Sequence, residues 1–226
     1  MKKILCIVFG VLICSISFTQ VIRKVSINSG GSVQNISVLV DQNVIINFTV
    51  DGKIMDWGIE NNSVYNYQEK LDQYMGLVDY YTANDNPAYS GKVKYIGRTL
   101  VTYYTSSENE FWQGKIKSIG MMLFNYYDVY DDEIFRSNIK SAGGVYFNWF
   151  GSIDNEGYRG KLKTLGPTAF TYFASYDDKA FKGKIKSIGS NTFSYYSSYD
   201  KPGYSGAMKT GTRSSFMNGI RYLVGY

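Results

Sequence analysis

A seven-residue phrase recurs along this chain at a constant interval of 23 residues. It reads GKIKSIG in two of its copies, and the copies begin at Gly91, Gly114, Ser137, Gly160, Gly183 and Gly206. A strict period between about 20 and 50 residues is the signature of a repeat protein, in which each period supplies one structural unit. The period constrains the fold more than any local pattern does. We therefore expect one unit per 23 residues from residue 91 onward.

Aligning the units shows columns that keep one kind of side chain. The third column is aliphatic, and the seventh is glycine in all units but the last. The fourth column is always lysine: Lys94, Lys117, Lys140, Lys163, Lys186 and Lys209. The fourteenth column is always aromatic: Tyr104, Tyr127, Phe150, Phe173 and Tyr196. We expect the lysines and the aromatics each to form a row along the repeated structure.

Each unit is expected to supply two β-strands. β-Branched and aromatic residues are frequent, glycines mark the turns, and the chain holds only three prolines. The first strand carries the lysines and ends at the seventh-column glycine, and the second ends at an acidic turn. Alternation places the third- and fifth-column side chains on one face and the lysines on the other. In the second strand it groups the eleventh, thirteenth and seventeenth columns and points the fourteenth the opposite way.

Two architectures accommodate such a unit, an antiparallel meander of hairpins and a parallel β-solenoid. Equivalent residues are about 9.6 Å apart in the meander and about 4.8 Å apart in the solenoid. Even in water, neighbouring lysines repel by about 0.9 kcal/mol at the shorter spacing and about 0.4 kcal/mol at the longer one. The sequence shows no acidic column beside the lysines, whereas a meander allows lysine stems to cover the aromatic rings between them. We therefore predict an all-β antiparallel meander.

The residues before the regular units divide into three parts. Residues 20–51 hold the alternating segment Val21–Asn28 and the β-branched runs Val33–Val40 and Val44–Val50, and Asp51-Gly52 is a turn signal, which predicts a short N-terminal β segment. Residues 52–90 hold imperfect copies of the phrase, beginning with GKIMDWG, and are expected to be irregular capping repeats. Residues 1–19 combine two early lysines with an apolar run and small residues near Thr19. The expected regular repeats then span 91–226.

The first 19 residues are typical of a secretory signal peptide. The apolar run Ile4–Ile16 is shorter than the roughly 20 residues that a membrane-spanning helix needs. A membrane anchor and lipid attachment at Cys14 are the alternatives. Cleavage before Gln20 would remove both cysteines, Cys6 and Cys14, and lower the formal net charge from +5 to +3. We expect an exported protein located in the periplasm, at the cell surface or outside the cell.

The composition limits the chemistry available to such a mature chain. It contains no histidine, and without its cysteines it has no thiol nucleophile, no imidazole base and no Cys/His metal site. A net charge of +3 is too small to indicate nucleic-acid binding. Paired acids such as Asp131 and Asp132 lie in a turn of a repeat, where we do not expect glycoside hydrolysis. The sequence predicts no enzyme, no cofactor and no metal.

The repeats resemble a known class in both length and sequence. Units of 23 residues that open with an aromatic-x-Gly step, as in Tyr204-Ser205-Gly206 and Phe181-Lys182-Gly183, are similar to the MORN-like β-hairpin repeats. The resemblance covers roughly residues 91–210, although Lys-Ile-Lys replaces the usual residues and the Gly-x-Gly of that class is absent. It implies an elongated twisted sheet built of successive hairpins.

The columns suggest a binding or structural role. The lysine row could form a basic track for an acidic glycan or an anionic cell-surface component, or a solvated face that prevents aggregation. The fourteenth-column aromatics could be stacking platforms for sugars, or cross-strand packing. The acidic column is expected to accept hydrogen bonds from its own turn. All eleven lysines and aromatics of these two columns are therefore candidate ligand contacts.

A membrane protein is the alternative interpretation. The chain ends IRYLVGY, with apolar or aromatic residues alternating back from a terminal tyrosine, as in the closing strand of outer-membrane β-barrels. The repeat strands are nevertheless shorter than the roughly 9–11 residues that a membrane strand needs. We therefore favour a non-enzymatic exported module that binds a polysaccharide or has a structural role. Contact with a membrane is expected only under the alternative.

Overall fold

The computed structural model describes residues 20–40, 43–61 and 70–225. Within these ranges the chain contains no α-helix, and its strands form three sheets. The predicted signal peptide, residues 1–19, lies outside the described residues together with both cysteines. The prediction of an all-β protein is confirmed.

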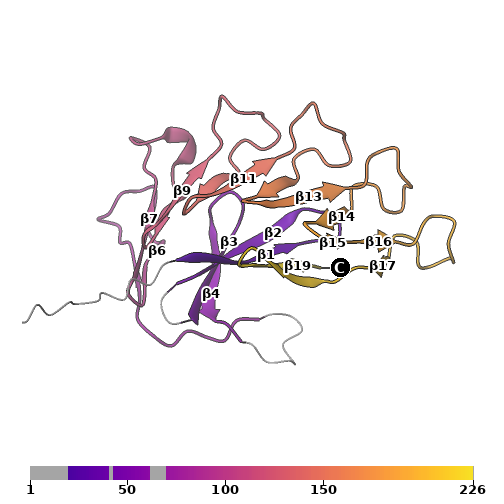
Figure 1. Cartoon of the computed structure of the whole chain (residues 1–226). Helices are drawn as coiled ribbons and strands as arrows, with labels where there is room; N and C mark the ends of the chain where they lie inside the picture. The colour runs from indigo at the N-terminus through magenta and orange to yellow at the C-terminus, as the bar shows by residue number, and fades with distance from the viewer. Residues whose placement is uncertain (1–19, 41–42, 62–69, 226) are drawn as a thin grey trace, which may run out of the picture.

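The smaller of the two large sheets joins the two ends of the described chain. It has six strands in the order β18 (Ser214–Met217), β19 (Ile220–Val224), β1 (Val21–Ile27), β2 (Val33–Leu39), β3 (Val44–Phe48) and β4 (Ile54–Ile59). Neighbouring strands are antiparallel except β1 and β19, which are parallel, with Val25 opposite Tyr222. The last described strand therefore lies beside the first one (Figure 1).

The larger sheet is a meander of eleven strands. Their order follows the sequence: β5 (Val78–Tyr80), β6 (Val93–Ile96), β7 (Thr99–Tyr103), β8 (Ile116–Ile119), β9 (Met122–Tyr126), β10 (Ile139–Ala142), β11 (Val145–Trp149), β12 (Leu162–Leu165), β13 (Thr168–Tyr172), β14 (Ile185–Ile188) and β15 (Asn191–Thr192). Two further strands, β16 (Ser194–Tyr195) and β17 (Met208–Thr210), pair with each other. Successive strands are antiparallel, as in Phe124 opposite Ala142. Equivalent strands are therefore two apart, as predicted for a meander and not for a solenoid.

Two segments that the sequence analysis placed within the repeats do not belong to the meander. Ile54–Ile59, expected within the capping repeats of 52–90, forms edge strand β4 of the six-stranded sheet. The residues of β18 and β19, expected within the repeats of 91–226, complete the same sheet at its other edge. Burial explains the second placement, because Tyr222 of β19 is fully buried against the ring of Phe170 in the meander.

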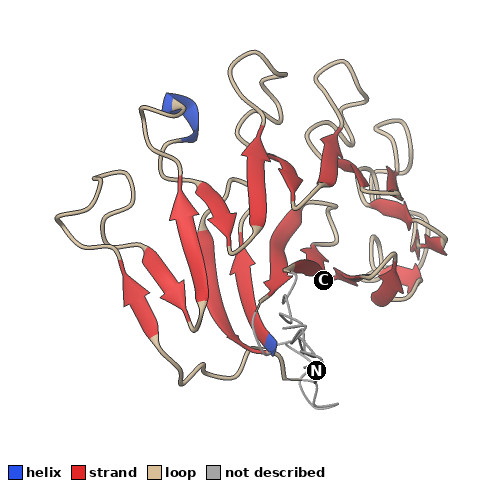
Figure 2. Ribbon diagram, turned by 60° about the vertical axis from the view of Figure 1, so that its left-hand side comes forward, coloured by secondary structure: helices blue, strands red, loops and turns tan. Residues whose placement is uncertain are grey.

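The two large sheets pack face to face. Figures 1 and 2 show the meander bending around the six-stranded sheet, with the long loops between units projecting from one edge. Buried side chains of both sheets form one core, in which the rings of Phe48 and Phe124 meet edge to face at 5.3 Å. The layers also meet through the backbone: the amides of Ile116 and Ile139 donate to the carbonyls of Gly52 and Val50, at 3.0 and 2.7 Å.

A β-bulge recurs at the fourth-column lysine of every regular unit. Ile139 pairs with Tyr126 and Ser141 pairs with Asn125, so that Lys140 between them has no partner residue. The same irregularity occurs at Lys94, Lys117, Lys163, Lys186 and Lys209. A bulge adds one residue to one strand, which bends the strand and increases its twist. The repeated bulge thus gives a physical reason for the curvature of the meander.

The bulge corrects the expected position of the fifth column. Strict alternation placed this small residue on the same face as the third column, but the extra residue of the bulge turns it to the outer face, beside the twelfth column. There Asn125 Nδ2 donates to Ser141 Oγ at 3.0 Å, and Asn148 Nδ2 donates to Thr164 Oγ1 at 2.7 Å. The sixth column points inward instead, as shown by the fully buried Leu165. A polar ladder therefore runs along the outer face of the meander.

The second strand of each unit matches the prediction in two columns and departs from it in a third. The eleventh and thirteenth columns are buried, as in Phe124 and Tyr126. The Tyr126 hydroxyl donates to the carbonyl of Ile116 at 2.8 Å, as expected of a buried polar group. The seventeenth column was expected on the same face, but Tyr199 of that column is 94% exposed. The strand ends before this position and the chain turns into a loop, so the alternation no longer applies.

Left-handed backbone occurs at both turns of the unit. Gly120, in the two-residue hairpin turn between β8 and β9, has φ +56°, and such turns favour glycine at that position. The residue that opens each unit also has positive φ, for example +75° at Gly114. Ser137 occupies this position in one unit, with φ +75°. A residue with a Cβ is strained in this conformation.

Replacing Ser137 with glycine should stabilise the protein. The substitution relieves left-handed strain but adds flexibility to the unfolded chain, so we expect a net gain of about 0.5–1 kcal/mol in the free energy of unfolding. Urea denaturation followed by circular dichroism measures the change. Ser106→Gly is the matched control, since Ser106 lacks a positive φ and should gain nothing. Equal gains in both variants would contradict the strain assigned to Ser137.

Removing the buried hydroxyl of Tyr126 should destabilise the protein. Tyr126→Phe leaves the Ile116 carbonyl without this donor in the core, which is expected to cost about 1–2 kcal/mol. The matched change Tyr199→Phe removes an exposed hydroxyl and should alter stability by less than about 0.5 kcal/mol. Chemical denaturation of both variants measures the difference. Equal effects of the two substitutions would show that the Tyr126 hydrogen bond does not contribute to the core.

Candidate functional site

The structure brings the two candidate columns together. Each fourth-column lysine follows the aromatic strand of the preceding unit, and its ammonium lies over the fourteenth-column ring of that unit. The ammonium-to-centroid distances are 5.3 Å for Lys94–Tyr81, 5.9 Å for Lys117–Tyr104, 4.9 Å for Lys140–Tyr127, 5.3 Å for Lys163–Phe150, 5.7 Å for Lys186–Phe173 and 5.5 Å for Lys209–Tyr196. These are cation–π distances. The prediction that lysine stems cover the rings in a meander is confirmed.

The fourteenth-column rings also make contacts between units. The ring of Tyr127 lies 4.7 Å from that of Phe135, and its hydroxyl donates to the carbonyl of Phe147 in the next unit at 3.0 Å. The Tyr104 hydroxyl makes the equivalent bond to Phe124 at 2.7 Å. All five rings are half-buried. This geometry favours packing between units over an open stacking surface for sugars.

The lysine row differs in charge along its length. Lys117 forms an ion pair with Glu108, and Lys140 Nζ lies 3.9 Å from Asp131 Oδ1. The acidic turn of one unit thus lies beside the lysine of the next, which corrects the expectation that no acid neutralises the row. Lys163 and Lys186 are exposed and make no ion pair with a described residue. This half of the row therefore carries free positive charge on the outer face.

The acidic turns hold the long loops in place. The backbone amide of Asp128 donates to the Asp131 carboxylate at 2.9 Å, and the amide of Ala174 donates to Asp177 at 2.6 Å. The predicted role of the acidic column within its own turn is confirmed by these bonds. A second polar column links neighbouring loops, since Asp178 accepts from the amide of Ser198 at 3.0 Å.

The tips of these loops carry apolar side chains that sequence analysis missed. They belong to the seventeenth column and are 86–98% exposed: Tyr130, Ile153, Tyr176 and Tyr199. The repeat signal was present in the sequence, but the exposure was not. Strand alternation grouped this column with the eleventh and thirteenth columns on one face, and only the path of the loop shows that the side chains point into solvent.

A second lysine column faces inward, although strand alternation placed it on the same face as the fourth-column lysines. It holds Lys92, Lys115, Lys161 and Lys184, at the second position of their units. These lysines are half-buried and lie over thirteenth-column rings, with Lys115 Nζ 4.8 Å from the centroid of Tyr126. Lys115 donates to the carbonyl of Ser137 at 2.7 Å, and Lys161 donates to Gly30 of the other sheet at 2.6 Å. The hydrogen bonds of these lysines therefore connect neighbouring units and connect the meander to the other sheet.

Burial sets the protonation of these inner groups. It lowers the pKa of Lys115 to about 8, with the charge of Asp51 opposing and that of Lys53 reinforcing the effect. Burial likewise lowers the pKa of Lys161. It raises the pKa of Tyr195 to about 12 and that of Tyr126 well above its usual value. The core thus favours the neutral form of both lysine and tyrosine.

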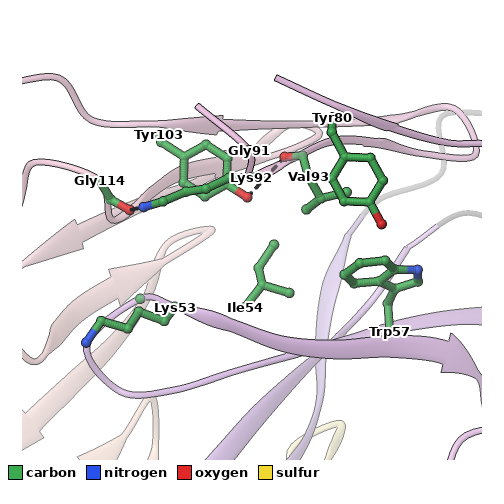
Figure 3. Close-up of a pocket in the computed structure, with 10 residues that line it drawn as sticks. Lys53, Ile54, Trp57, Tyr80, Gly91, Lys92, Val93, Tyr103 and Gly114 are labelled. Carbon is green, nitrogen blue, oxygen red and sulfur yellow. Dashed lines mark hydrogen bonds between the residues drawn. The ribbon is translucent and has the colours of Figure 1, made fainter. Parts of the chain in front are cut away.

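A pocket of about 400 Å³ opens where the two sheets part at the β4–β5 end. Its lining combines Gly52, Lys53, Ile54 and Trp57 from β4 and the turn before it, Tyr80 from β5, Gly91 and Lys92 from the residues before β6, Val93 from β6, Tyr103 from β7, and Gly114 from the next unit. Figure 3 labels these residues apart from Gly52. Sequence analysis named Gly52, Gly91 and Gly114 only as turn or first residues of units and predicted no pocket here, because the pocket brings together two sheets whose packing the sequence does not reveal.

No family model, curated protein or solved structure matches the chain. No helix in the described ranges is long and apolar enough to cross a membrane. Among the same residues, no three histidine, cysteine, aspartate or glutamate side chains are grouped as metal ligands would be.

The inner lysines and tyrosines predict an unusual pH dependence of stability. Between about pH 8 and 10 an unfolded lysine keeps the proton that folded Lys115 releases, so the free energy of unfolding should rise. Above about pH 10 an unfolded tyrosine loses the proton that folded Tyr195 keeps, so the free energy of unfolding should fall. Urea denaturation at a series of pH values measures the profile. Lys115→Met should flatten the rise, and a steady fall from pH 8 would contradict the prediction.

Proposed function

We propose that this chain is an exported, non-enzymatic module that binds an anionic polysaccharide along its outer lysine row. The observation that carries the proposal is the pair Lys163 and Lys186, both exposed, in equivalent positions of neighbouring units and without an acidic partner among the described residues. Equivalent strands lie about 9.6 Å apart, so these charges repeat at a regular interval. A polymer with regularly spaced carboxylates or sulfates is a ligand of matching form.

The contacts that hold Lys163 and Lys186 in place favour binding. Lys163 and Lys186 sit at bulges, and their ammonium groups lie over the rings of Phe150 and Phe173. A lysine that is already held by a ring loses less side-chain entropy when it contacts a ligand. The polar ladder beside the row, such as Asn148 with Thr164, offers further hydrogen-bonding groups. The fourteenth-column rings would act in this site by positioning lysines, and not by stacking on sugars.

The export signal is the part of the proposal that depends on the first 19 residues alone. An exported chain meets the polysaccharides of the cell surface, which suits the charge of the row. A purely structural role is the competing proposal, in which the lysines only keep the meander soluble. The two proposals differ in one observable, the retention of the mature chain on an anionic polymer.

Replacing Lys163 and Lys186 should weaken this retention. The mature chain is expected to bind immobilised polygalacturonate but not its methyl ester, and the interaction should weaken with added salt because exposed charges are screened. Lys163→Gln combined with Lys186→Gln is expected to reduce affinity about tenfold, given a contribution of up to about 1 kcal/mol from each exposed charge. Affinity chromatography over a salt gradient, with binding isotherms, measures both effects.

The control variant has the same loss of charge elsewhere. Lys179 and Lys201 lie on the exposed loops, and replacing both with glutamine should leave retention nearly unchanged. Equal losses in the two double variants would assign the binding to net charge and contradict a lysine-row site. A mature chain that is not retained at low salt would support the structural role. A chain recovered only in detergent would contradict both proposals.

A further inference from the structure

The pocket at the β4–β5 end has two chemically different ends. Figure 3 shows the rings of Trp57 and Tyr80 at one end, and Lys53 and Lys92 toward the other, with Ile54 between them. The two rings lie 6.5 Å apart at an angle of 58°. The described residues that line the pocket include no acidic side chain. The pocket therefore offers an apolar aromatic wall and a cationic wall to the same ligand.

The aromatic end of the pocket is open because Tyr80 lies on the edge strand of the meander. Tyr80 occupies the position that corresponds to Tyr103 and Tyr126 in the following units, where the ring is buried in the core. Tyr80 lies on β5, the edge strand of the meander, and is 48% exposed. A ring that the fold elsewhere buries here faces a cavity. Contact with a planar apolar group would complete its burial.

The cationic end carries charge that is only partly compensated. Lys53 Nζ lies 2.7 Å from Asp51 Oδ2, while Lys92 donates to the carbonyl of Gly114 and lies 5.0 Å from the ring centroid of Tyr103. Burial, and then the charge of Lys53, lower the pKa of Lys92. The two ammonium groups thus repel each other, and only Lys53 has an acidic partner among the described residues. An anionic group placed near both would relieve this repulsion.

We propose that this pocket binds a small aromatic carboxylate, with its ring against Trp57 and Tyr80 and its carboxylate toward Lys92 and Lys53. The volume of about 400 Å³ lies within the range of about 300–1,000 Å³ found for small-molecule sites. Aromatic walls with a few polar groups that fix orientation are typical of such sites. The site shares no residue with the outer lysine row, so it is independent of the proposed polysaccharide binding.

Tryptophan fluorescence provides a direct test. The probe is 4-hydroxycinnamate, whose absorption overlaps tryptophan emission, and its amide is the neutral control of the same shape. We expect 4-hydroxycinnamate to quench the mature protein with a saturable curve, and the amide to bind at least tenfold more weakly. Trp57→Phe should remove most of the quenching and leave binding measurable by calorimetry, because phenylalanine keeps a ring in the wall. Trp112 and Trp149 are retained in this variant and give its remaining fluorescence.

Charge variants test the other end of the pocket. Lys53→Gln changes a side chain that is 74% exposed, so folding should be unaffected, and affinity should fall about fivefold. Lys92→Met should lower affinity tenfold or more, with circular dichroism reporting whether the variant folds. Lys163→Gln, in the outer row, should change nothing here.

Three outcomes would overturn the assignment. The first is the absence of quenching at millimolar probe. The second is equal affinity for acid and amide, which would indicate hydrophobic binding without charge recognition. The third is an unchanged affinity in Lys53→Gln together with quenching that survives Trp57→Phe, which would place the probe elsewhere. None of these outcomes bears on retention by polygalacturonate, so the two proposals fail separately.

Discussion

The recurrent β-bulge is the constraint on which the rest of this structure depends. One unpaired residue per unit bends each first strand, and the accumulated bend carries the meander around the six-stranded sheet. The third-column amide next to the bulge turns toward the other layer, where Ile116 and Ile139 donate to the loop that precedes β4. A flat meander would leave the apolar faces of both sheets in contact with water, which is unfavourable at about 25 cal/mol per Å².

The same bulge explains why lysine occupies the fourth column. The extra residue of a bulge projects from the sheet without a cross-strand neighbour, and a long cationic side chain reaches back over the aromatic ring of the preceding strand. The stem then covers apolar surface while the ammonium stays in water. Lys140 and Lys163 do this alike, yet only Lys140 has an acid close by. The same bulge therefore positions lysines whose charge is neutralised by an acid and lysines whose charge is not, along one row.

The molecule presents three surfaces that differ in chemistry. The outer face carries the lysine row with its polar ladder, the loop edge carries apolar tips such as Tyr176, and the β4–β5 end opens into a pocket with aromatic and cationic walls. The first surface arises from the repeat itself and suits a repeating ligand. The pocket arises at the first strand of the meander, because among the described residues no strand pairs with the free edge of β5 to bury Tyr80.

The sequence alone determined the unit, its two strands and its turns. The 23-residue period, the glycine and acidic turn signals and the charge repulsion between lysines were enough to choose an antiparallel meander. Only the tertiary structure decided which faces the columns occupy, since a bulge breaks the alternation at Lys140 and a loop ends it before Tyr199. It also decided that β18 and β19 return to pair with β1, and that Trp57 meets Tyr80. Such contacts join residues far apart in the chain, and their free energy comes from burial between sheets, which a local pattern does not specify.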